Sequence, residues 1–479
     1  MNAPAEPTRL AYERTRREHW DQLSDWKSPV WGGFNTYYHQ RLAEIYRYLV
    51  PRGSRVLELG CGAGDLLAAL EPAYGVGVDF SPRLLAMAAQ RYPSLNFVEA
   101  SAQDFASSET FDYILLSDLV NELWDVQYTL QNLGRFCGPQ TRVVINTYSH
   151  LWQLPRNFAE STRLVSTLPP QNWLTREDLR SLLDLAGLES IRSWTEILWP
   201  FRTPLLDRFA NRFMAKVWPF RVCALSNFIV ARPKAQVAPK QLSVSIVVAA
   251  RNEQGNISEI FRRTDGLFEK AELIFVEGNS SDDTFGEIER QMAANPHRKC
   301  KLFRQPGKGK GDAIRVGFAN AECDVLMILD ADMTVAPEDL PRFYDAIASG
   351  VAEFVNGVRL VYPMEKEAMR FFNLLGNKFF SLAFSWLLGQ NIKDTLCGTK
   401  VLTRDNYNRI AAGRSYFGEF DPFGDFDLIF GAAKCNLKIV DMPIRYRERL
   451  YGETNINRWR DGSILLRMVA FAMFRIKFV

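Results

Sequence analysis

A repeated alternation of short apolar segments with helical segments is the feature that most constrains this sequence. In the first half, four apolar segments predict buried strands. They lie at residues 55–62 (RVLELGCG), 75–80, 111–120 and 141–148. Helical segments lie between them, as at 82–92, where Ser81 is placed to cap the helix and Pro82 to occupy its first position. Alternating strands and helices predict a parallel, doubly wound sheet.

The alternation begins again in the second half of the chain. Buried strands are predicted at 243–250, 271–278 and 324–332, with helices between them. Between the halves, SNFIVARP (226–233) is predicted to be a closing strand, and a cationic, proline-containing linker follows it. The fold class is therefore α/β with two doubly wound domains. We predict one domain over 1–232, a linker over 233–241 and a second domain over 242–479, each of ordinary domain size.

Composition excludes several classes of protein. Lys+Arg 58 against Asp+Glu 55 gives a formal charge of +3 over 479 residues, too balanced for a protein dedicated to nucleic acid. Seven widely spaced cysteines without a CxxC pair indicate reduced thiols and a cytoplasmic protein. The first twenty residues lack an apolar core, and no run of about 18 uncharged apolar residues occurs, so we expect neither a signal peptide nor a membrane-spanning helix.

A glycine-rich loop follows the first strand. ELGCGAGD (58–65) places Gly60, Gly62 and Gly64 where the backbone must turn tightly and approach a ligand. The next helix offers its positively polarised N-terminus there. Asp79 ends the following strand, where a carboxylate accepts hydrogen bonds from both hydroxyls of a ribose. The pattern therefore predicts a site for a ligand that carries a ribose.

On these motifs, residues 30–150 resemble the class I S-adenosylmethionine-dependent methyltransferases, with a Rossmann-like fold. The resemblance implies that Glu58, Gly60 and Gly62 shape the methionine pocket, that Gly64 contributes to cofactor binding and that Asp79 binds the ribose. It further implies that Asp104 faces the adenine amino group. Ser117 and Asp118 are expected beside the methionine and the transferred methyl.

The methyl acceptor is not specified by these motifs. The sulfonium is already activated, so alignment in a dry pocket supplies most of the catalysis. A hydroxyl acceptor requires a general base, for which Glu122, Asp125 and His150 are candidates by position only. Tyr37, Tyr38 and His39 either cover the cofactor or pack in the core, and the Trp-rich segment 150–222 is expected to cap the acceptor pocket. The alternative is a domain that binds the cofactor only as a sensor or scaffold.

In the second half, polar groups follow each predicted strand. The first strand ends in Ala250, Arg251, Asn252 and Glu253, the second in Glu277, and the third in Asp330 and Asp332; a cationic glycine loop, GKGKGDAIR, occupies 307–315. Ligands of α/β sheets gather at these carboxyl ends. Two carboxylates at i and i+2 can reach one ion, and oxygen ligands select Mg²⁺ or Mn²⁺.

This arrangement suits a nucleoside diphosphate. A metal on Asp330 and Asp332 would neutralise the diphosphate as it leaves the anomeric carbon. Glu277 is placed to accept from a base N–H or a ribose hydroxyl. Lys308 and Lys310 are placed to line the base and ribose.

Residues 242–455 resemble the family-2 glycosyltransferases, whose domain is of the GT-A type, and most closely the dolichyl- and polyprenyl-phosphate sugar synthases. Ala250 replaces the family's usual proline, and Glu277-Gly278 replaces its acidic pair. DTLCGTK (394–400), DPFGDFDL (421–428) and RERLYGETN (447–455) match its later motifs. The resemblance implies that Ala250, Asn252 and Glu253 contribute to nucleotide-sugar binding and that Asp394, Asp425 and Asp427 border the acceptor site. It also implies that Arg359, Arg447 and Arg449 clamp phosphates, that Thr454 and Asn455 close over the diphosphate, and that transfer inverts the anomeric centre.

Two apolar segments, 371–390 and 464–479, carry interspersed polar or basic residues. Such segments are typical of helices that lie on a membrane surface, and the alternative is a pair of core helices. The leading hypothesis is a bifunctional enzyme, peripheral on the cytoplasmic face of a membrane. It would use S-adenosylmethionine, and Mg²⁺ or Mn²⁺ with a nucleotide-sugar, and transfer sugar to a polyprenyl phosphate or glycan. The alternative is transfer to a hydroxyl of a soluble glycan or metabolite.

Overall fold

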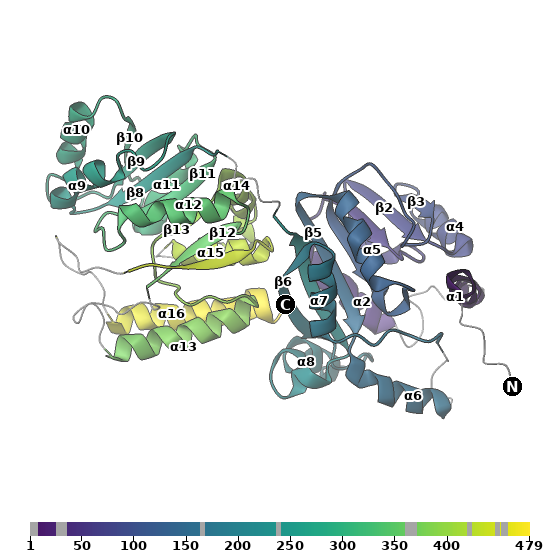
Figure 1. The fold of residues 1–479 in the computed structure, drawn as a ribbon. Helices are drawn as coiled ribbons and strands as arrows, with labels where there is room; N and C mark the ends of the chain where they lie inside the picture. Colours follow the sequence, from purple (N-terminus) through teal and green to yellow (C-terminus); the bar gives the residue numbers. More distant parts are fainter. Residues whose placement is uncertain are drawn as a thin grey trace. The chain divides into compact units, whose positions relative to one another are not determined.

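The computed structural model describes residues 8–24, 36–162, 168–235, 241–359, 371–418, 424–445, 451 and 458–479. The chain forms two compact units (Figure 1). The first contains residues 1–234 together with 478–479, and the second contains residues 235–477.

The first unit is built on a seven-stranded sheet in the order β3-β2-β1-β4-β5-β7-β6. The strands are β1 (Arg55–Leu59), β2 (Tyr74–Asp79), β3 (Asn96–Glu99), β4 (Phe111–Ser117), β5 (Cys137–Tyr148), β6 (Leu188–Glu196) and β7 (Ser226–Pro233). Strands β1 to β5 pair in parallel, whereas β7 is antiparallel to both β5 and β6. The sheet is therefore mixed, and it departs from the predicted parallel arrangement at one inserted strand.

Helices cover both faces of this sheet. They are α1 (Arg9–Ser24), α2 (Thr36–Leu49), α3 (Asp65–Ala69), α4 (Pro82–Arg91), α5 (Val126–Leu133), α6 (Gln153–Ser161), α7 (Arg176–Leu185) and α8 (Leu206–Arg212). Helices α2 and α3 bury apolar side chains on one face, and α5 and α7 on the other. The predicted start of α4 is confirmed, because Ser81 Oγ accepts from Leu84 N at 3.2 Å and Pro82 follows it.

The second unit also contains a mixed seven-stranded sheet, in the order β10-β9-β8-β11-β13-β12-β14. The strands are β8 (Val244–Ala250), β9 (Ala271–Glu277), β10 (Lys299–Arg304), β11 (Val325–Asp330), β12 (Phe354–Val358), β13 (Lys400–Thr403) and β14 (Ile439–Pro443). Strand β13 alone among them is antiparallel to its neighbours, β11 and β12. The ends of β8, β9 and β11 therefore meet at one edge, as the parallel pairing predicts.

The helices of this unit again form two layers. They are α9 (Gln254–Thr264), α10 (Thr284–Ala294), α11 (Lys310–Ala319), α12 (Leu340–Ala348), α13 (Phe371–Leu388), α14 (Arg404–Ala412), α15 (Asp425–Lys434) and α16 (Arg458–Ala472), with a final turn at Met473–Lys477. Helices α9, α10 and α12 cover one face of the sheet. The opposite face carries α11, α14 and α15, and α13 and α16 contribute to the same core.

Helices α13 and α16 lie side by side (Figure 1). Their inner side chains, among them Phe384 and Met468, are buried in the core. Outer side chains of these helices and of the final turn, among them Leu382 at 73% and Phe474 at 56%, are exposed. One side of this helix pair is therefore part of the core, as the alternative of two core helices predicts. The other side exposes apolar side chains to solvent. Among the helices that the structure describes, none has the length and apolarity needed to cross a membrane.

Candidate active sites

The glycine loop of the first unit has the conformation that its sequence requires. Gly60, Gly62 and Gly64 have φ of +71°, +52° and +76°, in the left-handed region that favours glycine. A Cβ on Gly60 would lie 2.8 Å from Leu119 Cδ1, whereas a Cβ on Gly62 would meet nothing within 4 Å. The loop is therefore packed at its first glycine and open at its second, where a ligand can approach the backbone.

Asp79 joins this loop to the next strand. Its carboxylate accepts from Gly62 N and from Ser81 N, each at 2.9 Å. Burial raises the pKa of Asp79, and these hydrogen bonds oppose that shift. Glu58 is also buried, which raises its pKa well above the usual range, and its Oε2 accepts no hydrogen bond from the residues that the structure describes. Glu58 is the next-to-last residue of β1 and Asp79 is the last residue of β2.

Asp118 forms a polar cluster at the end of β4, next to the half-buried Ser117. Its backbone is at φ +53°, an unfavourable conformation for a residue with a side chain. Tyr38 Oη of α2 donates to its carboxylate at 3.0 Å, and Asn146 Nδ2 of β5 donates at 2.5 Å. Burial raises the pKa of Asp118 to about 7. Tyr38, for which the sequence left two interpretations open, is thus buried and bonded to a predicted methyl-site residue.

Helix α1 runs past the ends of three strands. Trp20 Nε1 donates to Glu122 Oε2 at 2.8 Å, and Ser101 Oγ donates to Glu13 Oε1 at 3.0 Å. Asp104, predicted to face adenine, is exposed and forms an ion pair with Arg9 of this helix.

The remaining positional candidates do not gather at Asp118. Asp125 caps α5 by accepting from Tyr128 N at 2.9 Å, and His150 is exposed. The tryptophans of segment 150–222 differ in their surroundings. Trp194 stacks on Phe228 at 5.4 Å between ring centroids, whereas Trp218 is 72% exposed.

In the second unit, a cluster of two lysines and two aspartates lies at the carboxyl edge of the sheet. Lys310, at the start of α11, donates to Asp330 at the end of β11. Lys400, fully buried on β13, donates to the carbonyl of Cys397, and its Nζ lies 3.8 Å from Asp425 Oδ1. Asp425 begins α15 after Gly424, whose φ is +79°. We call these four residues the Lys–Asp cluster.

The charges of the Lys–Asp cluster stabilise one another. Burial would raise the pKa of Asp330, but Lys310 and Lys400 outweigh it and the pKa is lowered. Burial would lower the pKa of Lys310, but Asp330 and Asp425 hold it above its ordinary value. Burial raises the pKa of Asp425 despite the two lysines. Lys310 is therefore held in its charged form at the carboxyl edge of the sheet.

Two glycines allow the Lys–Asp cluster to assemble. A Cβ on Gly398 would overlap both Asp330 and Lys310, and a Cβ on Gly424 would overlap the backbone of Gly311. Both glycines lie in the later motifs, DTLCGTK and DPFGDFDL. The overlaps indicate that each glycine is needed because neighbouring atoms approach its Cα closely.

Asp394 and Asp427, predicted with Asp425 to border the acceptor, are engaged in separate ion pairs. Asp394 and Arg359 form a two-pronged pair, with Nε–Oδ2 at 2.7 Å and Nη2–Oδ1 at 2.9 Å. Arg359 lowers the pKa of Asp394, although burial opposes this. Asp427 pairs with Arg414 at 2.8 Å. Asp425 is thus the one of the three that joins the Lys–Asp cluster.

The residues predicted to hold the nucleoside lie around the ends of β8 and β9. Asn252, at φ +57°, accepts from Ser281 N at 2.7 Å, and Glu277 accepts from Ser280 N at 2.5 Å. Both side chains therefore order the loop after β9.

The other members of this set differ in exposure. Ala250 and Glu253 are buried, and Glu253 accepts from Asn256 Nδ2 at 2.6 Å. Lys308 is exposed on the glycine loop.

The predicted donor set for a metal is Asp330 and Asp332. Asp332 Oδ1 accepts from Thr334 N at 3.1 Å and from Thr334 Oγ1 at 2.9 Å. Within the described ranges, no group of three His, Cys, Asp or Glu side chains could hold an ion. Two carboxylates fit Mg²⁺ or Mn²⁺ when substrate phosphates complete the shell, as is usual for Mg²⁺.

Arg447, Arg449, Thr454 and Asn455 lie outside the described residues. Between them, Tyr451 is described, and its ring lies against Gly255 of α9, where a Cβ would come within 2.6 Å of Tyr451 Cδ2. The motif that contains the four predicted residues is thus tied at Tyr451 to the segment after β8.

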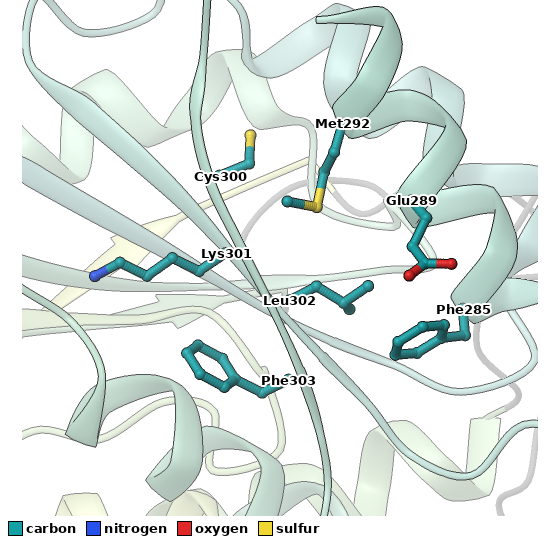
Figure 2. Close-up of a pocket in the computed structure, with 7 residues that line it drawn as sticks. All are labelled: Phe285, Glu289, Met292, Cys300, Lys301, Leu302 and Phe303. Carbon is teal, nitrogen blue, oxygen red and sulfur yellow. The ribbon is translucent and has the colours of Figure 1, made fainter. Parts of the chain in front are cut away.

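A cavity of about 460 Å³ lies elsewhere, between α10 and the edge strand β10 (Figure 2). Leu302 points toward Phe285, Glu289 and Met292, whereas Lys301 points away from them. No predicted site residue lines this cavity.

Three residues were missed by the sequence reasoning: Gly398, Lys400 and Arg414. Gly398 and Lys400 stand in DTLCGTK, a motif that was identified as a whole without assigning them roles. A buried lysine in an antiparallel strand has no sequence signal, because its carboxylate partner comes from a distant helix.

Comparison with known proteins agrees with this division. The family model "Glycosyl transferase family 2" matches residues 245–410, and "Methyltransferase domain" matches residues 34–193. The dolichyl-phosphate hexose transferase of Haloferax volcanii is 30% identical over 230 residues, which cover 46% of this chain and 90% of that protein. Glycosyltransferase AglJ of the same organism is 27% identical over 231 residues, 47% of this chain and 71% of that protein.

Among solved structures, glucosyl-3-phosphoglycerate synthase from Mycobacterium tuberculosis was determined with Mn²⁺, uridine diphosphate and glucosyl-3-phosphoglycerate. It matches at 18% identity with a TM-score of 0.36, covering 49% of this chain and 80% of that one.

Proposed function

Because the chain belongs to glycosyl transferase family 2 through its C-terminal unit and carries an N-terminal methyltransferase domain, we propose that it catalyses two transfers. The N-terminal unit moves a methyl group from S-adenosylmethionine. The C-terminal unit moves a sugar from a nucleotide-sugar to a polyprenyl phosphate, with inversion. The observation that carries the glycosyl proposal is the Lys–Asp cluster at the carboxyl edge of the sheet.

The chemistry of sugar transfer assigns roles to the Lys–Asp cluster. Lys310 supplies positive charge where the diphosphate leaves, and Lys400, 3.8 Å from the Asp425 carboxylate, orients it. A phosphate acceptor is already nucleophilic, so Asp425 orients the acceptor and no strong base is required. Asp394 holds Arg359, and we assign both as positioning residues. Asp330 and Asp332 would hold Mg²⁺ or Mn²⁺, which supplies charge neutralisation at the diphosphate.

The acceptor class can be tested with the full chain. We expect a radiolabelled sugar, offered from a panel of nucleotide-sugars, to enter the organic phase when polyprenyl phosphate is present, with the anomeric configuration inverted. A soluble glycan offered instead should remain unlabelled. Label on the soluble glycan alone would favour the alternative acceptor, and a product that retains configuration would contradict inversion.

The methyl-transfer proposal rests on the open glycine loop and its bond to Asp79. The loop holds the cofactor, Asp79 accepts from its ribose, and Tyr38 and Asn146 keep Asp118 at the methyl end of the pocket. Charge-assisted hydrogen bonds of this kind are worth about 1.5–3 kcal/mol each.

Asp79→Ala should weaken S-adenosylmethionine binding by about 30-fold or more, because the ribose loses its acceptor. Isothermal titration calorimetry measures this directly. The matched control is Glu99→Ala, which removes an exposed carboxylate from the end of the neighbouring strand β3. Equal affinity of Asp79→Ala and wild type would refute the assignment.

We further propose that the exposed side of α13 and α16 lies on the membrane that contains the polyprenyl phosphate. Phe379, Leu382, Leu466 and Phe474 are exposed there, with Arg467 and Arg475 among them. Apolar groups with interspersed cations suit an anionic lipid surface.

A further inference from the structure

The connection between β6 and β7 in the first unit, residues 197–225, buries polar side chains. Asn211 of α8 is 1% exposed. It accepts from Leu198 N at 2.7 Å and Trp199 N at 2.8 Å, and its amide donates to Trp199 O at 2.6 Å and Tyr37 Oη at 3.1 Å. One buried side chain therefore ties α8 to the segment before it and to α2.

A second buried bond system fixes the later part of the β6–β7 connection. Lys216 Nζ lies 3.0 Å from Glu196 Oε1, and both side chains are buried. Thr195 Oγ1 donates to Ala215 O at 2.9 Å. The connection is thus an ordered part of the unit.

The same connection exposes many of its large apolar side chains to solvent. Nine large apolar side chains between residues 199 and 222 are exposed, with Leu205 at 83% and Trp218 at 72%. Leu205 also has φ +67°, a conformation that costs energy in a residue with a side chain. A cluster of exposed apolar groups marks a surface that contacts a protein, a ligand or a membrane.

The charges of the β6–β7 connection are of one sign. Arg202, Arg208, Arg212 and Arg221 are exposed, whereas the carboxylate of Asp207 is buried. No other Asp or Glu occurs between residues 197 and 225. Exposed cations among Trp, Phe and Leu complement an anionic lipid surface. The cations attract the anionic headgroups, and the apolar side chains enter the boundary between headgroups and acyl chains.

Helix α6 extends this surface. Trp152 Nε1, just before α6, donates to Cys223 O at 3.0 Å, so the start of α6 lies beside the end of the β6–β7 connection. Leu154 and Phe158 of α6 are exposed.

We propose that the methyltransferase unit has its own lipid-binding surface, formed by the β6–β7 connection and α6, which docks on anionic membranes. This surface is made of other residues than those exposed on α13 and α16, and the proposal does not depend on the acceptor of the glycosyltransferase. It would hold the methyl-transfer site at a membrane even when the second unit is not bound there.

The test compares full-length chains in co-sedimentation with vesicles of phosphatidylcholine, with and without phosphatidylglycerol. The parent carries L382Q and F474Q, which remove apolar groups from the α13–α16 surface. A second chain adds L205N, L206Q and F220Q, and circular dichroism would verify that its fold is kept. A third chain adds R208E and R221E instead. Control chains add L185Q or R135E, at exposed positions of the same unit outside this surface.

We expect the parent to bind phosphatidylglycerol vesicles and the second chain to bind at least about tenfold more weakly. The third chain should lose its preference for phosphatidylglycerol, and the controls should stay within about twofold of the parent. A parent that does not bind, or a second chain that binds as the parent does, would overturn the proposal. The proposal is also wrong if the second chain binds vesicles normally but loses self-association in light scattering, because the surface then serves a second copy.

Discussion

Gly398→Ala is expected to reduce sugar transfer by at least about 100-fold while S-adenosylmethionine binding stays unchanged. The added methyl group would overlap the Asp330 carboxylate and the Lys310 ammonium together. Asp330 is a short side chain at the end of a buried strand, so it cannot swing aside, and the ion pair must separate. Misplacing charged groups at a catalytic site by about 1 Å costs on the order of 100-fold in rate.

The matched control is Gly376→Ala in α13 of the same unit, where a Cβ would meet nothing within 4 Å. Its rate should equal that of wild type. Measuring both sugar transfer and cofactor binding on each variant separates a local effect from unfolding of the whole chain. Wild-type sugar transfer by Gly398→Ala would show that the Lys–Asp cluster is not part of the site.

The strand ends and turns at the two sites were largely predictable, because each follows from residues that are adjacent in the sequence. Glycines after β1 and carboxylates at the ends of β2 and β11 follow directly from strand periodicity and turn composition. The prediction of two α/β domains is confirmed by the sheets and by the family matches. The wholly parallel arrangement is wrong at β7 and β13, since strand direction depends on where a later segment inserts into the sheet.

Ion pairing was the part that the sequence could not reveal. Asp394, Asp425 and Asp427 appear equivalent along the chain, yet their partners are Arg359, the Lys–Asp cluster and Arg414. Asp425 and Asp427 are two residues apart on α15, and a helix turns such neighbours to different sides. Only the tertiary packing determines which carboxylate meets which cation.

The side chains that the β6–β7 connection buries could not be predicted from its composition. The Trp-rich segment 150–222, which includes most of this connection, was predicted to cap the acceptor pocket. The structure instead buries Asn211 and Lys216 and exposes Trp218 and Leu205. Composition alone cannot distinguish a segment whose aromatic side chains cover a pocket from one whose aromatic side chains are exposed, since both contain the same kinds of residue.

Asp332→Asn is the second change for which we expect a large effect, a loss of at least about 100-fold in sugar transfer. Asparagine retains an oxygen that can accept from Thr334, so the turn after β11 should persist. It removes the negative charge proposed to hold the metal, and metal neutralisation of a leaving diphosphate is worth several kcal/mol. Asp332 is the better position to test, because Asp330 also binds Lys310.

The central claim, sugar transfer from a metal-bound nucleotide-sugar to a lipid phosphate, is tested most directly by one donor screen. Three proteins are each offered a panel of nucleotide-sugars and polyprenyl phosphate: wild type, Asp332→Asn and the control Asp339→Asn. Asp339 is a half-buried carboxylate that pairs with Arg342 at 3.6 Å. Each is assayed with Mg²⁺, with Mn²⁺ and with a chelator. We predict lipid-linked product from wild type and Asp339→Asn with metal, and almost none from Asp332→Asn or with the chelator. Undiminished product from Asp332→Asn with every donor, or from wild type with the chelator, would contradict the account.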